Sequence, residues 1–287
     1  MKLKLKMRIK LTRKQQNILM LFLLIFGVGI LAYPDVAGWY QGLRHDALLQ
    51  GYAEEVALME EQQIQYELER AIEHNKALGG IEAIDPFAPG SGSVLSMEYY
   101  NILNLSSTMG RIEIPAINVD LPIFHGVESD VLDRGVGHMP HTPFPIGGEG
   151  NHSILSAHTG LVNARMFTDL ELLDLGDIFI VTVLNNRIAF EVDQIDVVYP
   201  HQIEVLQTYP DRDLMTLVTC TPYGINTHRL LVRGTRIPYT SGMASGVQVV
   251  LPALNLRMLI ILMFSFVFLL ISIDYRMRQK RRRLKEA

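Results

Sequence analysis

The sequence has little cysteine: its 287 residues include one, Cys220, and also a single tryptophan. One cysteine cannot form a disulfide within the chain, which excludes a disulfide-stabilised scaffold. The motifs G-x-x-x-x-G-K-[ST], G-x-G-x-x-G, G-x-S-x-G and H-E-x-x-H are also absent, so no familiar nucleotide, serine-hydrolase or zinc-protease site is predicted. His138 and His141 have a possible ligand spacing, but Pro140 between them argues against a helix that holds both. We therefore expect neither a metal nor a cofactor.

The charge is divided unevenly along the chain. Residues 1–33 carry seven Lys or Arg and no acid, for a charge of +7, and residues 251–287 carry +6. The segment between them carries −17, although the whole chain is only −4. A nucleic-acid-binding protein places positive charge on its folded domain, so this distribution argues against a nucleic-acid partner.

Two uncharged apolar runs lie beside the basic clusters, Asn17–Tyr33 and Met258–Ile273. We interpret residues 17–33 as a transmembrane anchor, or alternatively as the apolar region of a signal peptide, and residues 251–273 as a C-terminal transmembrane helix. The positive-inside rule then makes residues 1–16 and 274–287 cytoplasmic basic tails. The expected protein is a multi-pass protein of the cell membrane, with the acidic middle outside the cytoplasm.

The acidic middle is predicted to begin with a helical stalk over residues 34–80, since apolar residues recur there at three- and four-residue steps until Gly79-Gly80. Residues 81–108 are rich in Pro, Gly and Ser and are predicted to be a long loop. From Gly110 the pattern changes to eight short strands, which favours a small barrel or sandwich. The expected strands are Arg111–Ile114, Val119–Phe124, Ile154–Ala157, Ile178–Leu184, Arg187–Val192, Gln194–Tyr199, Leu214–Thr219 and Arg229–Arg236.

Cys220 closes one of these strands and precedes Thr221-Pro222, which ends it. A lone cysteine is often only a small buried residue, but an unpaired thiol outside the cell is open to oxidation and its presence there needs a reason. A nucleophilic thiol needs a proton carrier and an oxyanion donor. Among nine histidines, His158 also follows a predicted strand, and Arg229 opens the strand that returns toward Cys220. The residues alone leave both interpretations open.

Three segments resemble the sortase family. Thr216-Leu217-Val218-Thr219-Cys220 matches the T-L-x-T-C signature, and Leu155–Gly160 resembles the segment with the catalytic His, here His158. Arg229 falls where sortases have their catalytic Arg. The resemblance covers roughly residues 105–240 and implies a mainly β fold, a sortase-type eight-stranded β-barrel over residues 109–240, preceded by the helical segment and flanked by the two transmembrane helices.

The second apolar span and Asp85-Pro86-Phe87 in the long loop resemble the class C, pilus-assembling sortases. That resemblance implies a lid over residues 81–108 that covers the substrate site with Asp85 and Phe87. It also implies a Gram-positive cell-surface transpeptidase that cleaves an LPxTG-like sorting signal between Thr and Gly through a thioacyl intermediate. A pilin Lys amine would then accept the acyl group. The alternatives are a housekeeping-type sortase that attaches proteins to peptidoglycan, and a non-catalytic, membrane-tethered envelope scaffold.

Overall fold

A computed structural model describes residues 12–78, 85–88, 90, 96–161, 164–202, 206–243, and the single residues 263, 265 and 268. The chain divides into two compact units. One contains Met1–Trp39 together with Val250–Ala287, and the other contains Tyr40–Val249.

The N-terminal apolar run lies in a long helix, α1 (Arg13–Leu58), which begins four residues before the predicted span. Pro34 lies inside α1, so the predicted boundary between anchor and stalk is not a helix end. By length and composition α1 is the one helix among the described residues that could cross a membrane, a test that a signal sequence also passes. The predicted helix 251–273 lies outside the described residues except at positions 263, 265 and 268, which are helical, and the tail 274–287 and residues 1–11 also lie outside them.

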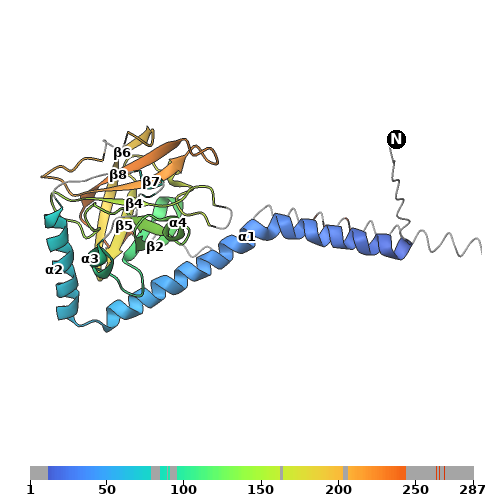
Figure 1. Cartoon of the computed structure of the whole chain (residues 1–287), viewed down its shortest axis with the longest axis horizontal. Helices are drawn as coiled ribbons and strands as arrows, with labels where there is room; N and C mark the ends of the chain where they lie inside the picture. Colours follow the sequence, from blue (N-terminus) through green and yellow to red (C-terminus); the bar gives the residue numbers. More distant parts are fainter. Residues whose placement is uncertain are drawn as a thin grey trace, which may run out of the picture. The chain divides into compact units, whose positions relative to one another are not determined.

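Eight strands close into a barrel in the order β1-β2-β3-β4-β7-β8-β6-β5, as expected for a sortase-type fold. The pairs β2–β3 and β4–β7 are parallel, and the other pairs are antiparallel. The strands are β1 (Gly110–Ile114), β2 (Val119–His125), β3 (Val136–His138), β4 (His152–Ser156), β5 (Ile178–Val183), β6 (Asn186–Val198), β7 (Leu214–Thr221) and β8 (His228–Ile237) (Figure 1).

The predicted number of strands is right, but two of the assignments behind it are wrong. The two strands expected at 187–192 and 194–199 form the single strand β6, whose register with β8 shifts between Val192 and Gln194. Asp193 breaks the apolar alternation at this irregularity, and its carboxylate accepts hydrogen bonds from Arg233 at 2.9 and 3.0 Å. Strand β3 was not predicted, because three residues with a central Gly137 show no alternation.

The predicted stalk is two helices rather than one, α1 and α2 (Glu61–Ala77). At the start of α2 the backbone N–H of Glu60 donates to the side chain of Gln63 at 3.1 Å, which satisfies a helix-terminal group. Two buried residues of α2, Ile64 and Ala71, belong to the same apolar core as the barrel. Tyr52 of α1 is also buried, and its hydroxyl accepts from Leu184 N at 2.6 Å and donates to Met109 O at 3.2 Å.

The predicted loop over residues 81–108 is partly helical. Helix α3 (Met97–Asn101) is capped by Ser96, whose hydroxyl accepts a hydrogen bond from Tyr99 N at 3.3 Å. The Tyr99 ring is buried, and its hydroxyl lies 2.8 Å from Nδ1 of His138 on β3. This buried contact attaches the segment after residue 95 to the barrel, where composition alone indicated a loop. The short α4 (Ser129–Leu132) lies between β2 and β3.

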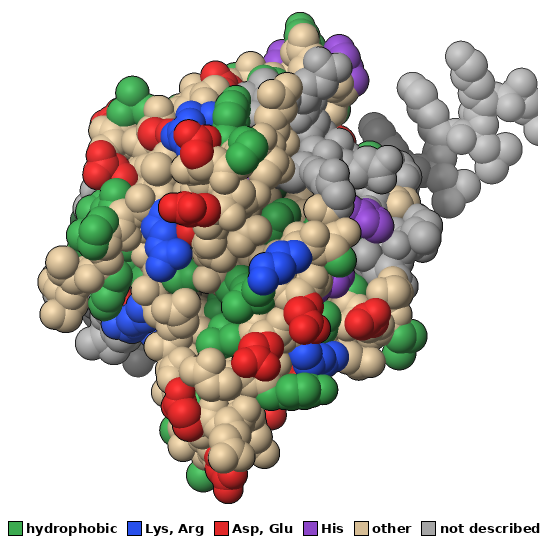
Figure 2. Space-filling view, turned by 90° about the vertical axis from the view of Figure 1, so that its left-hand side faces the viewer, with side chains coloured by type: hydrophobic (Ala, Val, Ile, Leu, Met, Phe, Trp, Pro, Cys, Tyr) green, Lys and Arg blue, Asp and Glu red, His purple; other side chains and the backbone are tan. Residues whose placement is uncertain are grey.

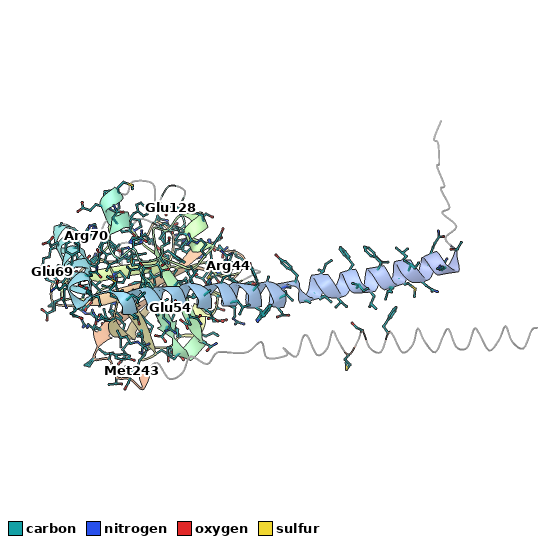
Figure 3. All side chains as sticks on the ribbon, turned by 90° about the horizontal axis from the view of Figure 1, so that it is seen from below. Arg44, Glu54, Glu69, Arg70, Glu128 and Met243 are labelled. Atoms are coloured by element: carbon teal, nitrogen blue, oxygen red, sulfur yellow. The ribbon has the colours of Figure 1, made fainter. Side chains whose placement is uncertain are left out.

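The surface of the described part carries charges of both signs. Arg44 and Glu54 of α1 and Glu69 of α2 are exposed (Figure 3). On the face shown in Figure 2, acidic and basic side chains are interspersed, and no strongly basic patch forms on that face.

Candidate active site

Cys220 and Arg229 lie directly opposite each other on neighbouring strands. In the antiparallel register of β7 and β8, Cys220 pairs with Arg229 and Thr221 pairs with His228. Opposed residues of an antiparallel pair have Cβ atoms about 5 Å apart. The turn between the two strands therefore brings the lone thiol and a guanidinium together at one end of the barrel.

His158 reaches the same end from the other side of β7. Strands β4 and β7 run parallel, with Ser156 opposite Val218. The pairing continues past β4, because Ala157 N donates to Val218 O at 3.2 Å and the Thr219 hydroxyl donates to Ala157 O at 2.8 Å. The residue after Ala157 is His158, which this pairing places beside the end of β7 that carries Cys220.

The segment with Asp85 and Phe87 lies over these residues. The Asp85 carboxylate accepts two hydrogen bonds from Arg229, from Nε at 2.7 Å and from Nη2 at 2.8 Å. Only 11% of the Asp85 side chain and 8% of the Arg229 side chain are exposed. The Phe87 ring centre lies 5.1 Å from the Arg229 guanidinium carbon and 5.7 Å from the His158 ring centre. All five residues singled out from the sequence thus belong to one cluster.

Asp85 and Phe87 are held together by a tight local turn. Phe87 N donates to Asp85 Oδ1 at 3.3 Å, and Ala88 N donates to the Asp85 backbone oxygen at 3.0 Å. Phe87 also packs against a small apolar cluster on the barrel, made of Val127, Leu132, Met139, Ile154, Leu206, Val218 and Leu231. The carboxylate and the ring therefore occupy the site as one unit.

Burial decides the charge of the thiol and the imidazole in this arrangement. Desolvation raises the pKa of Cys220; Arg229 lowers it and Asp85 raises it further. Desolvation lowers the pKa of His158, and the nearby Asp133 opposes that shift. Burial lowers the pKa of Arg229, but the hydrogen bonds that Arg229 donates to Asp85 and the Coulombic attraction of Cys220 and Asp85 together outweigh burial, so this pKa lies above its ordinary range. Both the thiol and the imidazole are therefore favoured in their uncharged forms.

Three of the other histidines are structural. Burial lowers the pKa of His125 to about 4, of His138 to about 3 and of His152 to about 4. Each has a ring nitrogen within 2.7 to 2.9 Å of a backbone oxygen. His138, the residue weighed above as a metal ligand, has both nitrogens engaged, with Tyr99 and with Pro143 O. Over the ranges that the structure describes, no three His, Cys, Asp or Glu side chains gather closely enough to hold a metal.

Asp133 is a residue of this site that no sequence pattern singled out. Its Oδ1 lies 3.6 Å from Nε2 of His158. The contact depends on the pairing of β3 with β4, and β3 was not predicted. Because β3 and β4 are antiparallel, the residues that precede β3 lie opposite those that follow β4. Had β3 been predicted, this register would have placed Asp133 near His158.

A family model described as the sortase domain matches residues 112–237. Sortase A of Streptococcus agalactiae is 32% identical over 116 residues, which cover 39% of this chain and 47% of that protein. Sortase D of Bacillus subtilis is 28% identical over 131 residues, which cover 45% of this chain and 63% of that protein. The chain thus spans between about half and two thirds of these two curated relatives.

Solved structures match over a longer range. Sortase C-1 of Streptococcus pneumoniae is 42% identical with a TM-score of 0.64, and the match covers 67% of this chain and 98% of that chain. Sortase C-1 of Actinomyces oris is also 42% identical, with a TM-score of 0.59 and coverage of 62% and 99%. Sequence identity and the closed barrel agree, and the chain belongs to the sortase family, with class C sortases as its structural neighbours.

Proposed function

We propose that this chain is a cysteine transpeptidase in which Cys220 is the nucleophile, His158 the proton carrier and Arg229 the oxyanion donor. The observation that carries the proposal is the cross-strand pair of Cys220 and Arg229, in a chain whose only cysteine is this one. A structural cysteine would not need a guanidinium opposite it. Similarity to sortases supports the same roles, because the three residues fall in the segments that resemble the family's motifs.

The chemistry proceeds by acyl transfer. The Cys220 thiol passes its proton to His158 as its sulfur attacks the Thr carbonyl of the Thr–Gly bond in an LPxTG-like sorting signal, and the tetrahedral oxyanion accepts hydrogen bonds from Arg229. His158 gives its proton to the leaving amine as the C–N bond breaks, which leaves a thioester on Cys220. An incoming amine attacks the thioester and loses a proton to His158; the released Cys220 thiolate then takes that proton back from His158, which restores the thiol. Arg229 suits its role because it stays charged and offers several donors.

The proposed substrates are the sorting signals of pilin subunits, with a pilin Lys amine as acceptor. Two relatives support this choice: one solved structure is described as sortase C1 of a pilus island, and another, from Streptococcus pneumoniae, is described as informing pilin substrate specificity. The Asp85–Phe87 segment over the site supports the class C assignment. A housekeeping sortase that transfers proteins to peptidoglycan is the alternative, and the acceptor distinguishes the two.

Asp85–Phe87 acts in this proposal as a lid. Its carboxylate occupies Nε and Nη2 of Arg229, two of the donors that an oxyanion would use. Substrate binding therefore requires the segment to leave. In the same proposal residues 17–33 and 251–273 anchor the enzyme in the cell membrane, the tails 1–16 and 274–287 are cytoplasmic, and the catalytic barrel 109–240 faces outward.

The test uses the full chain in detergent, a fluorescent LPxTG peptide and two acceptors, a pilin-derived Lys peptide and a peptidoglycan-like amine. We expect cleavage and transfer to the Lys peptide, and complete loss in Cys220→Ala. Arg229→Lys should slow turnover by about 10²–10³, the typical effect of removing one oxyanion donor. Arg233→Lys is the matched control, since Arg233 lies on the same strand and makes a similar two-bond contact with Asp193. Absence of cleavage by the wild type would favour the scaffold, cleavage retained in Cys220→Ala would exclude Cys220 as the nucleophile, and transfer only to the peptidoglycan-like amine would favour the housekeeping type.

A further inference from the structure

The carboxylate of Asp133 faces the imidazole of His158. Oδ1 of Asp133 lies 3.6 Å from Nε2, longer than a hydrogen bond of about 2.9 Å but close enough for a Coulombic interaction. His158 is 25% exposed and Asp133 is 59% exposed, so the pair lies at the edge of the site. None of the transfer steps described above uses Asp133.

The segment that carries Asp133 is firmly held. Strands β3 and β4 are antiparallel, with Gly137 opposite Ser156, so the residues before β3 lie opposite those that follow β4. Asp133 directly follows α4 as its C-cap, and its backbone N–H donates to Ser129 O at 2.9 Å. The backbone carbonyl of the following residue, Arg134, accepts a hydrogen bond from Nε2 of His45 at 2.8 Å.

The same segment packs closely on β2. A Cβ atom placed on Gly135 would lie only 2.7 Å from the ring of Phe124, so the chain touches that ring directly. The guanidinium carbon of Arg134 lies 4.6 Å from the centre of the same ring. Because neighbouring residues are fixed on two sides, the Asp133 carboxylate is presented to His158 from a rigid turn.

The other groups around His158 do not offer a competing charge. Phe87 contacts the ring and is apolar, and the two charged residues beside Phe87, Asp85 and Arg229, neutralise each other through their two hydrogen bonds. The remaining group of the site is the thiol of Cys220, which burial keeps uncharged. Asp133 is thus the unpaired charge that faces the imidazole among the residues described here.

We propose that Asp133 is a positioning residue for His158, whose carboxylate directs the Nε2–H toward itself and stabilises the imidazolium. The inference rests on the proposed function, because a transpeptidase needs His158 protonated when the amine leaves. With a proton held on Nε2, the other ring nitrogen, Nδ1, exchanges the proton with the leaving and incoming amines. Departure of the lid would reduce the burial of the ring but would also remove Asp85 from Arg229, and Asp133 would then be the carboxylate that still stabilises the imidazolium against that cation.

The first test measures the imidazole without any turnover. The full chain in detergent micelles is labelled with [13Cε1]histidine, and the His158 signal is assigned by its loss in His158→Gln. We expect the titration midpoint of His158 to fall in Asp133→Asn and to stay unchanged in Asp130→Asn, which removes a charge from the same helix. The difference should shrink at 1 M salt, where screening acts over about 3 Å. An unchanged midpoint in a folded Asp133→Asn protein would overturn the inference.

The second test uses the transfer assay. An exposed ion pair of this kind is expected to change kcat by about two- to fivefold at neutral pH, with KM little affected. The deficit of Asp133→Asn should shrink as the pH is lowered, and Asp133→Glu should restore part of the rate. A deficit that is the same at every pH would indicate a merely structural role. If the NMR midpoint shifts but wild type processes no peptide, the pairing stands and the proposed function fails.

Discussion

Removal of the Asp85 carboxylate should open the site, and the structure sets the size of the effect. Both members of the Asp85–Arg229 pair are nearly buried and share two short hydrogen bonds. A hydrogen bond to a charged group contributes about 1.5–3 kcal/mol to stability, and 1.4 kcal/mol is a factor of ten. Counting one such bond as the net loss, Asp85→Ala should raise the ratio of open to closed lid roughly tenfold to hundredfold. Arg229 adds to this effect, since it would be left buried without a counter-ion.

The readout is the rate at which a methanethiosulfonate reagent modifies Cys220. Because Cys220 is the chain's only cysteine, no background thiol contributes. The substitution also changes the thiol itself, since Asp85 raises the pKa of Cys220 and its loss lowers that pKa. The rate must therefore be followed with pH. A lower pKa moves the midpoint of the profile to lower pH, whereas lid opening raises the plateau at high pH, where every accessible thiol is ionised.

Asp193→Ala provides the matched control. The Asp193 carboxylate also accepts two hydrogen bonds from an arginine of β8, here Arg233. Arg233 lies opposite Thr216 rather than opposite Cys220, so this contact is away from the thiol. The rate of Cys220 modification in Asp193→Ala should reach the same plateau at high pH as in the wild type. Phe87→Ala should raise the plateau too, and the double variant should fall short of the product of the two effects, because both residues contact Arg229. A wild-type plateau in Asp85→Ala, with an unchanged thermal midpoint, would refute the idea that the segment covers the thiol.

Two further predictions concern stability and topology. Tyr52→Phe should lower the free energy of unfolding by about 1–3 kcal/mol, since it leaves the buried Leu184 N–H and the Met109 carbonyl without their hydrogen-bond partner. Tyr66→Phe is the control, because the Tyr66 ring is 60% exposed and its change should have little effect. Urea unfolding in detergent measures both variants, and equal effects would contradict a stabilising role for the Tyr52 hydroxyl. In a Cys220→Ala background, Lys2→Cys and Lys285→Cys should react with an impermeant thiol reagent only after the membrane is permeabilised, and labelling of either on intact cells would exclude cytoplasmic termini.

The sequence predicted the parts of the site that depend on adjacent strands. Strands β7 and β8 are joined by a short turn, so Arg229 could be placed near Cys220 from chain order alone. The helix α3 and the strand β3 were missed for a shared reason: each is short, and each is stabilised by tertiary contacts, such as that between Tyr99 and His138, rather than by a local pattern.

The details of the lid and of Asp133 could not be derived from local pattern. Asp85 and Arg229 are 144 residues apart in sequence, and the two hydrogen bonds between them depend on the whole barrel. The sequence placed Asp85 near the site but left open whether its partner would be Cys220 or Arg229, and the structure shows Arg229. Asp133 meets His158 through a strand pair that has no sequence signal.

The packing of α2 determines which fragments of this protein should fold on their own. The match to the sortase family model covers residues 112–237 only. The apolar core of the barrel nevertheless includes two residues of α2, Ile64 and Ala71. Three more residues of the two helices pack against that core: Val56, Met59 and Leu68. A recombinant fragment limited to the matched region would expose this apolar surface to water, at a cost of roughly 25 cal/mol for each Å². We expect such a fragment to aggregate, whereas one that starts near Tyr40 keeps the helices that complete the cooperative unit.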